Sequence, residues 1–107
     1  MLLFLCLGPA NAAIAQTEPI QTEPIQTVES LFSLNCAACH AGGGNIIRRG
    51  KNLKQKALMR YGYGEVEAIA QLVTQGKGIM PAYADRLSEE EIGAIAQYVL
   101  DQAQSGW

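Results

Sequence analysis

The sequence predicts an all-α fold, with about four short helices joined by loops that are long for a chain of this size. Apolar residues recur at helical spacing in four stretches after Thr27, and several stretches carry a helix start or stop signal. No stretch alternates apolar and polar residues as a strand would. The chain has 107 residues, 49% hydrophobic and 17% charged, which fits one globular domain.

Residues 1–15 are expected to be a signal peptide that is removed. Leu2 to Leu7 form a short apolar run, and Ala13-Ile14-Ala15 is a small-residue cleavage pattern. The run is far below the roughly 20 residues that a membrane span needs, which disfavours an anchor. The chain is therefore expected to be exported.

Residues 16–26 are expected to form an extended spacer. Gln16–Ile20 is repeated as Gln21–Ile25, and the proline in each copy opposes helix formation. The folded domain is expected to cover residues 27–107.

The first expected helix begins after Thr27, a residue type suited to an N-cap, and runs into Cys36. Val28, Leu31 and Phe32 would share one face of it. Three glycines at 42–44 then end any helix.

The second expected helix is capped by Asn52. Its inward face would carry Leu53, Ala57, Leu58 and Tyr61.

The third and fourth helices have the clearest boundaries. Val66, Ile69, Ala70 and Val73 form the stripe of the third helix, which stops at Gly76. Ser88 and Glu91 form a capping box for the fourth helix. The stripe of the fourth helix is Ile92, Ile95, Ala96 and Val99. These stripes contain few large side chains, so an additional apolar group is expected at the centre.

The charge is slightly acidic overall but unevenly distributed. The formal net charge of −2 argues against nucleic-acid binding, which needs a basic excess. Six of the eight basic residues lie between residues 48 and 60, with no acid among them. A solvated loop and helix face is the favoured interpretation of this run, and a docking patch for an acidic partner is the alternative.

The strongest chemical signal is Cys36-Ala37-Ala38-Cys39-His40. C-x-x-C-H is the attachment motif of haem c. Two thiols three positions apart lie on one side of a helix, where they can add to the two vinyl groups of one porphyrin. His40 then offers an imidazole to the iron.

Other uses of this motif are weaker. A redox dithiol calls for a surrounding βαβ pattern, which this sequence lacks, and leaves the histidine unexplained. A zinc site needs four ligands, and the chain has one histidine and no second cysteine pair. A disulfide closing so small a loop would add little stability.

The sixth iron ligand is open to methionine, lysine, water or nothing, because His40 is the only histidine. Met59 lies beside Leu58 on an expected helix and is interpreted as core packing. Met80 lies in a loop where glycines let the backbone bend and Pro81 fixes the chain after the sulfur. Met80 is therefore the favoured ligand.

Several motifs together resemble the cytochrome c6 family, over residues from about Val28 to Trp107. The motifs are Leu31–His40 followed by Gly42–Asn45, Gly76-Lys77 with Met80–Tyr83, Asp85–Ser88, Tyr98–Leu100 and the ending Gly106-Trp107. C-x-x-C-H alone would indicate only a haem c domain, whereas this combination is far more specific.

The resemblance implies a class I cytochrome c fold over 27–107, with the helices wrapped around one covalent haem c. It implies that Cys36 and Cys39 hold the haem and that His40 and Met80 bind the iron. The function it implies is soluble one-electron transport between the cytochrome bf complex and photosystem I, or a terminal oxidase. It places the protein in the thylakoid lumen or the periplasm, as a monomer that makes transient contacts and is not an enzyme.

Three departures from the family pattern keep an alternative open. Val28, Gly78-Ile79 and Thr74 stand where the family often has glycine, Asn-Ala and glutamine. The alternative is a low-potential c6-like carrier, or a redox-signalling protein with a different partner. A haem gas sensor or enzyme is less favoured, because no second histidine can serve as a distal acid or base.

Overall fold

The computed structural model describes Leu3, Gly8 and residues 26–107. The signal peptide expected over 1–15, apart from those two residues, and the spacer expected over 16–26, apart from Gln26, lie outside the described residues. The helices are α1 (Val28–Asn35), α2 (Ala37–His40), the 3-10 turn η1 (Ala41–Gly43), α3 (Gln55–Arg60), α4 (Val66–Gln75) and α5 (Glu89–Ser105). The all-α prediction is confirmed, since the β pairing among these residues is one isolated bridge.

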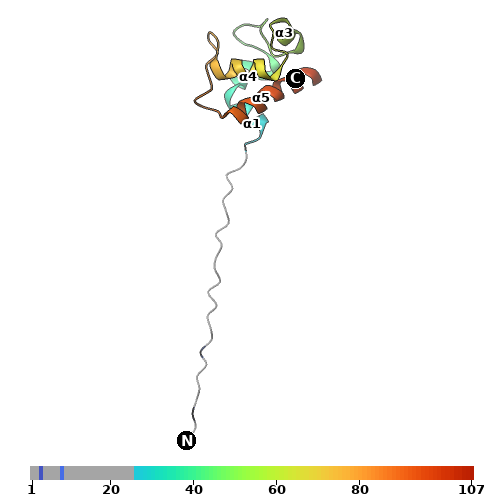
Figure 1. Ribbon diagram of the computed structural model, residues 1–107. Coiled ribbons are helices and arrows are strands. Elements are labelled where there is room, and N and C mark those ends of the chain that lie inside the picture. Colours follow the sequence, from blue (N-terminus) through green and yellow to red (C-terminus); the bar gives the residue numbers. More distant parts are fainter. Residues whose placement is uncertain (1–2, 4–7, 9–25) are drawn as a thin grey trace.

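Helix α5 is the centre of the fold (Figure 1). It packs against α1, α3, α4 and η1. The predicted capping box is present: Ser88 Oγ accepts from Glu91 N at 3.1 Å, and Glu91 Oε1 accepts from Ser88 N at 2.9 Å. All four predicted stripe residues, from Ile92 to Val99, are buried. No helix in the described ranges is long and apolar enough to cross a bilayer.

Helix α1 begins as predicted, with Thr27 Oγ1 accepting from Ser30 N at 3.2 Å. Leu31 and Phe32 are buried, and the Phe32 ring lies 5.3 Å from both Tyr98 and Trp107, centroid to centroid. Trp107 Nε1 donates to Leu53 O at 2.9 Å. The end of the chain is thus fixed both to α1 and to the loop before α3.

The first helix stops earlier than predicted. Cys36 has φ −120° and ψ −33°, so α1 ends at Asn35 and the motif forms its own short helix, α2. The backbone still connects across the break, because Cys36 N donates to Phe32 O and His40 N donates to Cys36 O.

Two predictions about α3 are wrong. Asn52 does not cap it, because its Oδ1 accepts from Lys54 N at 3.0 Å in a turn before the helix starts. Tyr61 does not face inward and is 43% exposed. Ala57 and Leu58 are buried as predicted, and Leu53 packs against the core.

Helix α4 follows the prediction closely. Ile69 and Val73 are buried, while Val66 and Ala70 pack against the core. The helix ends at Gly76, whose φ of 69° is a conformation that favours glycine. The loop that carries Met80 starts there.

Candidate haem-binding site

The site is built on the short helix α2. Cys36 directly precedes α2, and Cys39 and His40 are its last two residues. Cys39 N and His40 N both donate to Cys36 O, at 3.2 and 2.9 Å, so the three residues lie within one helical turn. Both thiols are free and partly exposed, so the disulfide considered for this pair is not formed. Two unpaired thiols and one imidazole are therefore offered from the same stretch of backbone.

One hydrogen bond fixes the chemistry of the His40 ring. Its Nδ1 lies 2.8 Å from Gly44 O. A carbonyl oxygen can only accept, so Nδ1 carries the proton and donates, which leaves the Nε2 lone pair free for a metal. Gly42 and Gly43, with φ of 61° and 75°, turn the chain so that Gly44 returns to the ring. Such a bond orients an imidazole ligand and raises its basicity.

The Met80 loop is a tight turn held at both ends. Lys77 and Met80 exchange two backbone hydrogen bonds, each of 3.0 Å. A Cβ on Gly76 would lie 2.7 Å from Met80 O, so only glycine fits beneath this turn. Tyr83 N donates to Val73 O at 2.9 Å, which joins the far end of the loop to α4. Met80 itself is partly buried and packs against the core.

Tyr83 links the Met80 loop to the cysteine motif, a contact that the sequence analysis missed. Its side chain is buried, and its hydroxyl donates to Asn35 O at 2.8 Å, directly before Cys36. Burial raises the pKa of the Tyr83 phenol, and the nearby Cys36 thiol, when ionised, raises it further. The signal available in the sequence was an aromatic residue with a polar tip, which needs a partner when buried.

The Cys36 thiol lies in apolar surroundings. Burial raises its pKa to about 11, because the charged thiolate is poorly solvated there. An uncharged thioether at this position would not carry that cost.

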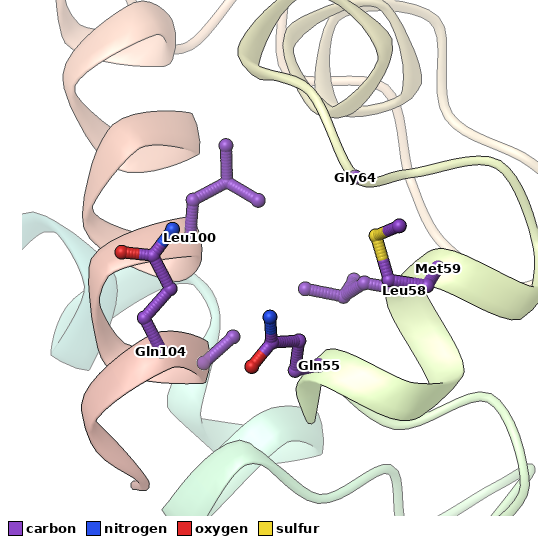
Figure 2. A pocket seen from close by; sticks show the side chains of 7 residues that line it. Gln55, Leu58, Met59, Gly64, Leu100 and Gln104 are labelled. Atoms are coloured by element: carbon purple, nitrogen blue, oxygen red, sulfur yellow. The ribbon is translucent and has the colours of Figure 1, made fainter.

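Met59 lies in a different place from the motif. It lines a hollow of about 100 Å³ between α3 and α5, together with Gln55, Leu100 and Gln104 (Figure 2). Its sulfur packs so closely on Gly64 that a Cβ there would lie 2.7 Å away. The side chain is 65% exposed, so its interpretation as core packing is wrong.

Thr74 is half-buried on α4, in the last turn before the Met80 loop. Its hydroxyl donates to Ala70 O at 2.7 Å. The Thr74 hydroxyl therefore donates its hydrogen bond to a backbone carbonyl of its own helix.

The residues fit a haem better than a bare metal ion. Large apolar side chains close to the motif and to Met80 in sequence stand exposed, notably Ile46 at 68% and Ile79 at 75%. A flat apolar ring system held by Cys36 and Cys39 would cover surface of this kind. Within the described ranges, no group of three or more His, Cys, Asp or Glu residues could hold a metal ion.

The chain is similar to known cytochromes. The family model described as "Cytochrome C oxidase, cbb3-type, subunit III" matches residues 23–99. A "Cytochrome c6-like" protein of Nostoc sp. (strain PCC 7120) is 54% identical over 91 residues, which is 85% of this chain and 82% of that protein.

Two further relatives are named as members of the cytochrome c6 group. "Cytochrome c6" of Microcystis aeruginosa is 54% identical over 78 residues, covering 73% of this chain and 96% of the relative. The crystal structure of cytochrome c6C from Synechococcus sp. PCC 7002 is 60% identical, with a TM-score of 0.72, over 75% of this chain and 98% of that one.

Proposed function

Because the chain belongs to the cytochrome c6 family, we propose that it carries single electrons on one haem c attached to Cys36 and Cys39, with His40 and Met80 as the iron ligands. The family shows the coarser part of this statement, a haem c electron carrier. The observation that supports the finer part is the 2.8 Å contact between His40 Nδ1 and Gly44 O, which leaves Nε2 as a ligand.

The bound cofactor supplies a reversible one-electron couple, and His/Met ligation raises its reduction potential. The chain supplies the positioning. His40 is oriented by Gly44, and the thioether of Met80 is offered from a turn that its own backbone hydrogen bonds close. Rigid ligands suit electron transfer, because the site then need not rearrange when its charge changes.

The proposed partners are membrane electron-transfer complexes, namely the cytochrome bf complex with photosystem I or a terminal oxidase. The proposed location is the thylakoid lumen or the periplasm, with the protein acting as a monomer in transient contacts. Support comes from the names of the relatives and from the signal pattern in residues 1–15.

A low-potential c6-like carrier with another partner is a second candidate. It is favoured by the likeness to proteins named cytochrome c6-like and cytochrome c6C. Thr74 is a further observation in its favour. The family often has glutamine at this position, whereas the Thr74 hydroxyl donates to Ala70 O within α4 and so does not replace the hydrogen bond that a glutamine amide could make.

Substituting the two methionines separately tests the ligation. Met80→Ala should abolish the methionine-to-iron charge-transfer band of the oxidised protein and open the iron to cyanide and carbon monoxide. Its midpoint potential should fall by on the order of 100 mV or more, since axial ligands dominate haem potentials. Met59→Ala is the control and should keep both the band and the potential.

The opposite pattern in these two variants would transfer the ligand role to Met59. A redox titration of the unmodified protein then separates the two candidates, because a midpoint well below that of the photosystem donors would favour the low-potential carrier.

A further inference from the structure

Trp107 has no part in the proposed function, although Gly106-Trp107 is one of the motifs that resemble the family. It follows helix α5, which ends at Ser105, and Gly106, with φ of 82°, lets the chain turn there. The indole ring packs against the core, with its centroid 5.3 Å from that of Phe32 and 6.0 Å from that of Tyr98. Two aromatic neighbours therefore restrict the orientation of the ring.

The indole ring of Trp107 lies directly against the backbone of Gly43. A Cβ built on Gly43 would collide with three ring atoms, Cγ, Cδ1 and Nε1. Gly43 is buried and has φ of 75°, a conformation that favours glycine. The ring thus fills the space in which any other residue would place its side chain, and it limits where the backbone of Gly43 can lie.

A second connection runs from the ring to Gly43 through Leu53. Trp107 Nε1 donates to Leu53 O at 2.9 Å, and Leu53 N donates to Gly43 O at 2.8 Å. The segment from Gly43 to Leu53 is therefore closed at its base by a backbone hydrogen bond. Gly43 is held by direct contact with the ring and, through Leu53, by the indole N–H.

The residue after Gly43 supplies the hydrogen-bond acceptor of His40. The Gly44 carbonyl lies 2.8 Å from His40 Nδ1, and Gly44 N donates to Ala41 O at 3.1 Å. Hydrogen bonds weaken steeply when their angle departs from linearity, so a rotation of the backbone at Gly43 would weaken the bond to the imidazole. The position of the Gly44 carbonyl thus depends on a side chain much later in the sequence.

Core packing alone does not account for these contacts. It explains why the ring touches Phe32 and Tyr98, and a leucine or phenylalanine could serve that purpose. Tryptophan adds an N–H donor that those side chains lack. That donor and the contact with Gly43 both act on the segment that continues into Gly44.

We propose that Trp107 is a positioning residue for His40: by fixing Gly43, the indole ring fixes the Gly44 carbonyl that orients the imidazole and raises its basicity. A more basic imidazole gives more electron density to the iron and favours the ferric state, so this hydrogen bond lowers the midpoint potential. Disturbing Trp107 should therefore raise the potential. The inference rests on the proposed function, because His40 has no iron to bind without a haem.

Two substitutions in the holoprotein test this role. Trp107→Leu removes both the ring and the N–H, whereas Trp107→Phe keeps an aromatic ring and loses the N–H. In Trp107→Leu the His40 Nδ1–H signal in the ¹H NMR spectrum of the ferrous protein should move upfield, because its hydrogen bond is weaker. The midpoint potential of the same variant should rise in a redox titration. Trp107→Phe should show both changes to a smaller extent.

Ile92→Ala is the control for a general loss of stability. Ile92 is buried at the other end of α5, and truncating it leaves a cavity in the core. This variant should lower the urea midpoint of unfolding at least as much as Trp107→Phe does. It should leave the His40 Nδ1–H signal and the midpoint potential unchanged, since it does not touch the loop that carries Gly44.

A Trp107→Leu protein in which either quantity fails to change in the predicted direction would overturn the positioning role and leave the electron carrier intact. Equal changes in Ile92→Ala would do the same. If Trp107→Leu does not fold, Trp107→Phe decides by the same criteria. Failure of the unmodified protein to hold a covalent haem, or the absence of His40 from the iron ligands, would instead overturn the proposed function and this inference together.

Discussion

At the scale of single residues, Tyr83 joins two segments that are 48 positions apart in sequence. Its hydroxyl donates to Asn35 O, next to Cys36, and its ring lies three residues after Met80. The Arg86 guanidinium lies 5.3 Å from the centre of that ring. Tyr83 therefore holds the Met80 loop against the segment that carries the first cysteine.

Tyr83→Phe should loosen this connection while keeping the aromatic packing. Losing the hydroxyl leaves Asn35 O without this donor, at a cost of about 1 kcal/mol. If the loop then opens more often, cyanide should bind the oxidised protein several-fold faster. Tyr61→Phe is the matched control, because that ring is exposed and lies on another segment. Equal cyanide rates in both variants would limit Tyr83 to packing.

Thr74 is the second residue with a predicted effect. Thr74→Gln should raise the midpoint potential while the methionine band persists, because an amide near the haem can stabilise the reduced state. One hydrogen bond of about 1 kcal/mol corresponds to roughly 40 mV for one electron. Redox titration measures the shift, and Thr74→Val separates loss of the hydroxyl from gain of the amide. A midpoint unchanged in Thr74→Gln would remove this residue from the argument for a low-potential carrier.

The local geometry of the candidate site was easier to predict from the sequence than the hydrogen bonds that its residues make. Spacing alone put Cys36, Cys39 and His40 on one helical turn, because that relation is local. The Gly44 carbonyl depends on the path of a three-glycine turn, and the Asn35 carbonyl on the approach of a distant loop. Backbone acceptors carry no residue-type signature, so neither contact could be predicted from the sequence.

At the scale of helices, boundaries set by local chemistry were predicted correctly. Thr27, Gly76 and the Ser88 capping box act within one turn of their helix. Asn52 misled because asparagine stabilises both N-caps and turns, and here its side chain bonds the backbone two residues on, before α3 starts. The prediction that Met59 packs in the core failed because α3 has only six residues, too few for the spacing of apolar residues to define a buried face.

The capping box gives a direct test of helix α5. Ser88→Ala removes the acceptor for Glu91 N and should cost about 1 kcal/mol of unfolding free energy. For a domain of this size the melting temperature should fall by roughly 4–8 °C. Ser105→Ala, at the other end of α5, is the control, because its hydroxyl only donates to a carbonyl in the last turn. Thermal unfolding followed by circular dichroism measures both, and equal melting temperatures would show that the cap contributes nothing.

At the scale of the whole molecule, the buried apolar residues of the described part form one cluster, to which α1, α4 and α5 contribute most. Ile95 is the only large side chain in the described part with an exposure below 2%. Helices α2 and α3 have four and six residues, and helices so short are not stable alone. An apolar group at the centre was predicted because the helical stripes contain few large side chains, and haem c is such a group in the cytochrome c6 family.

The last prediction concerns the same chain made without haem. A ligand that binds only the folded state stabilises it, and a covalent one cannot dissociate. In Cys36→Ala/Cys39→Ala, side chains such as Ile46 and Ile79 should stay in contact with water, and the short helices should lose their support. We expect less than about half of the far-ultraviolet helical signal and no cooperative urea transition. Met80→Ala is the control, because it retains covalent haem and should still unfold cooperatively. A cooperative transition of the double cysteine variant at the same urea midpoint as the Met80→Ala control would contradict this prediction. It would show that the core formed by α1, α4 and α5 folds without the haem, and that the haem adds no stability.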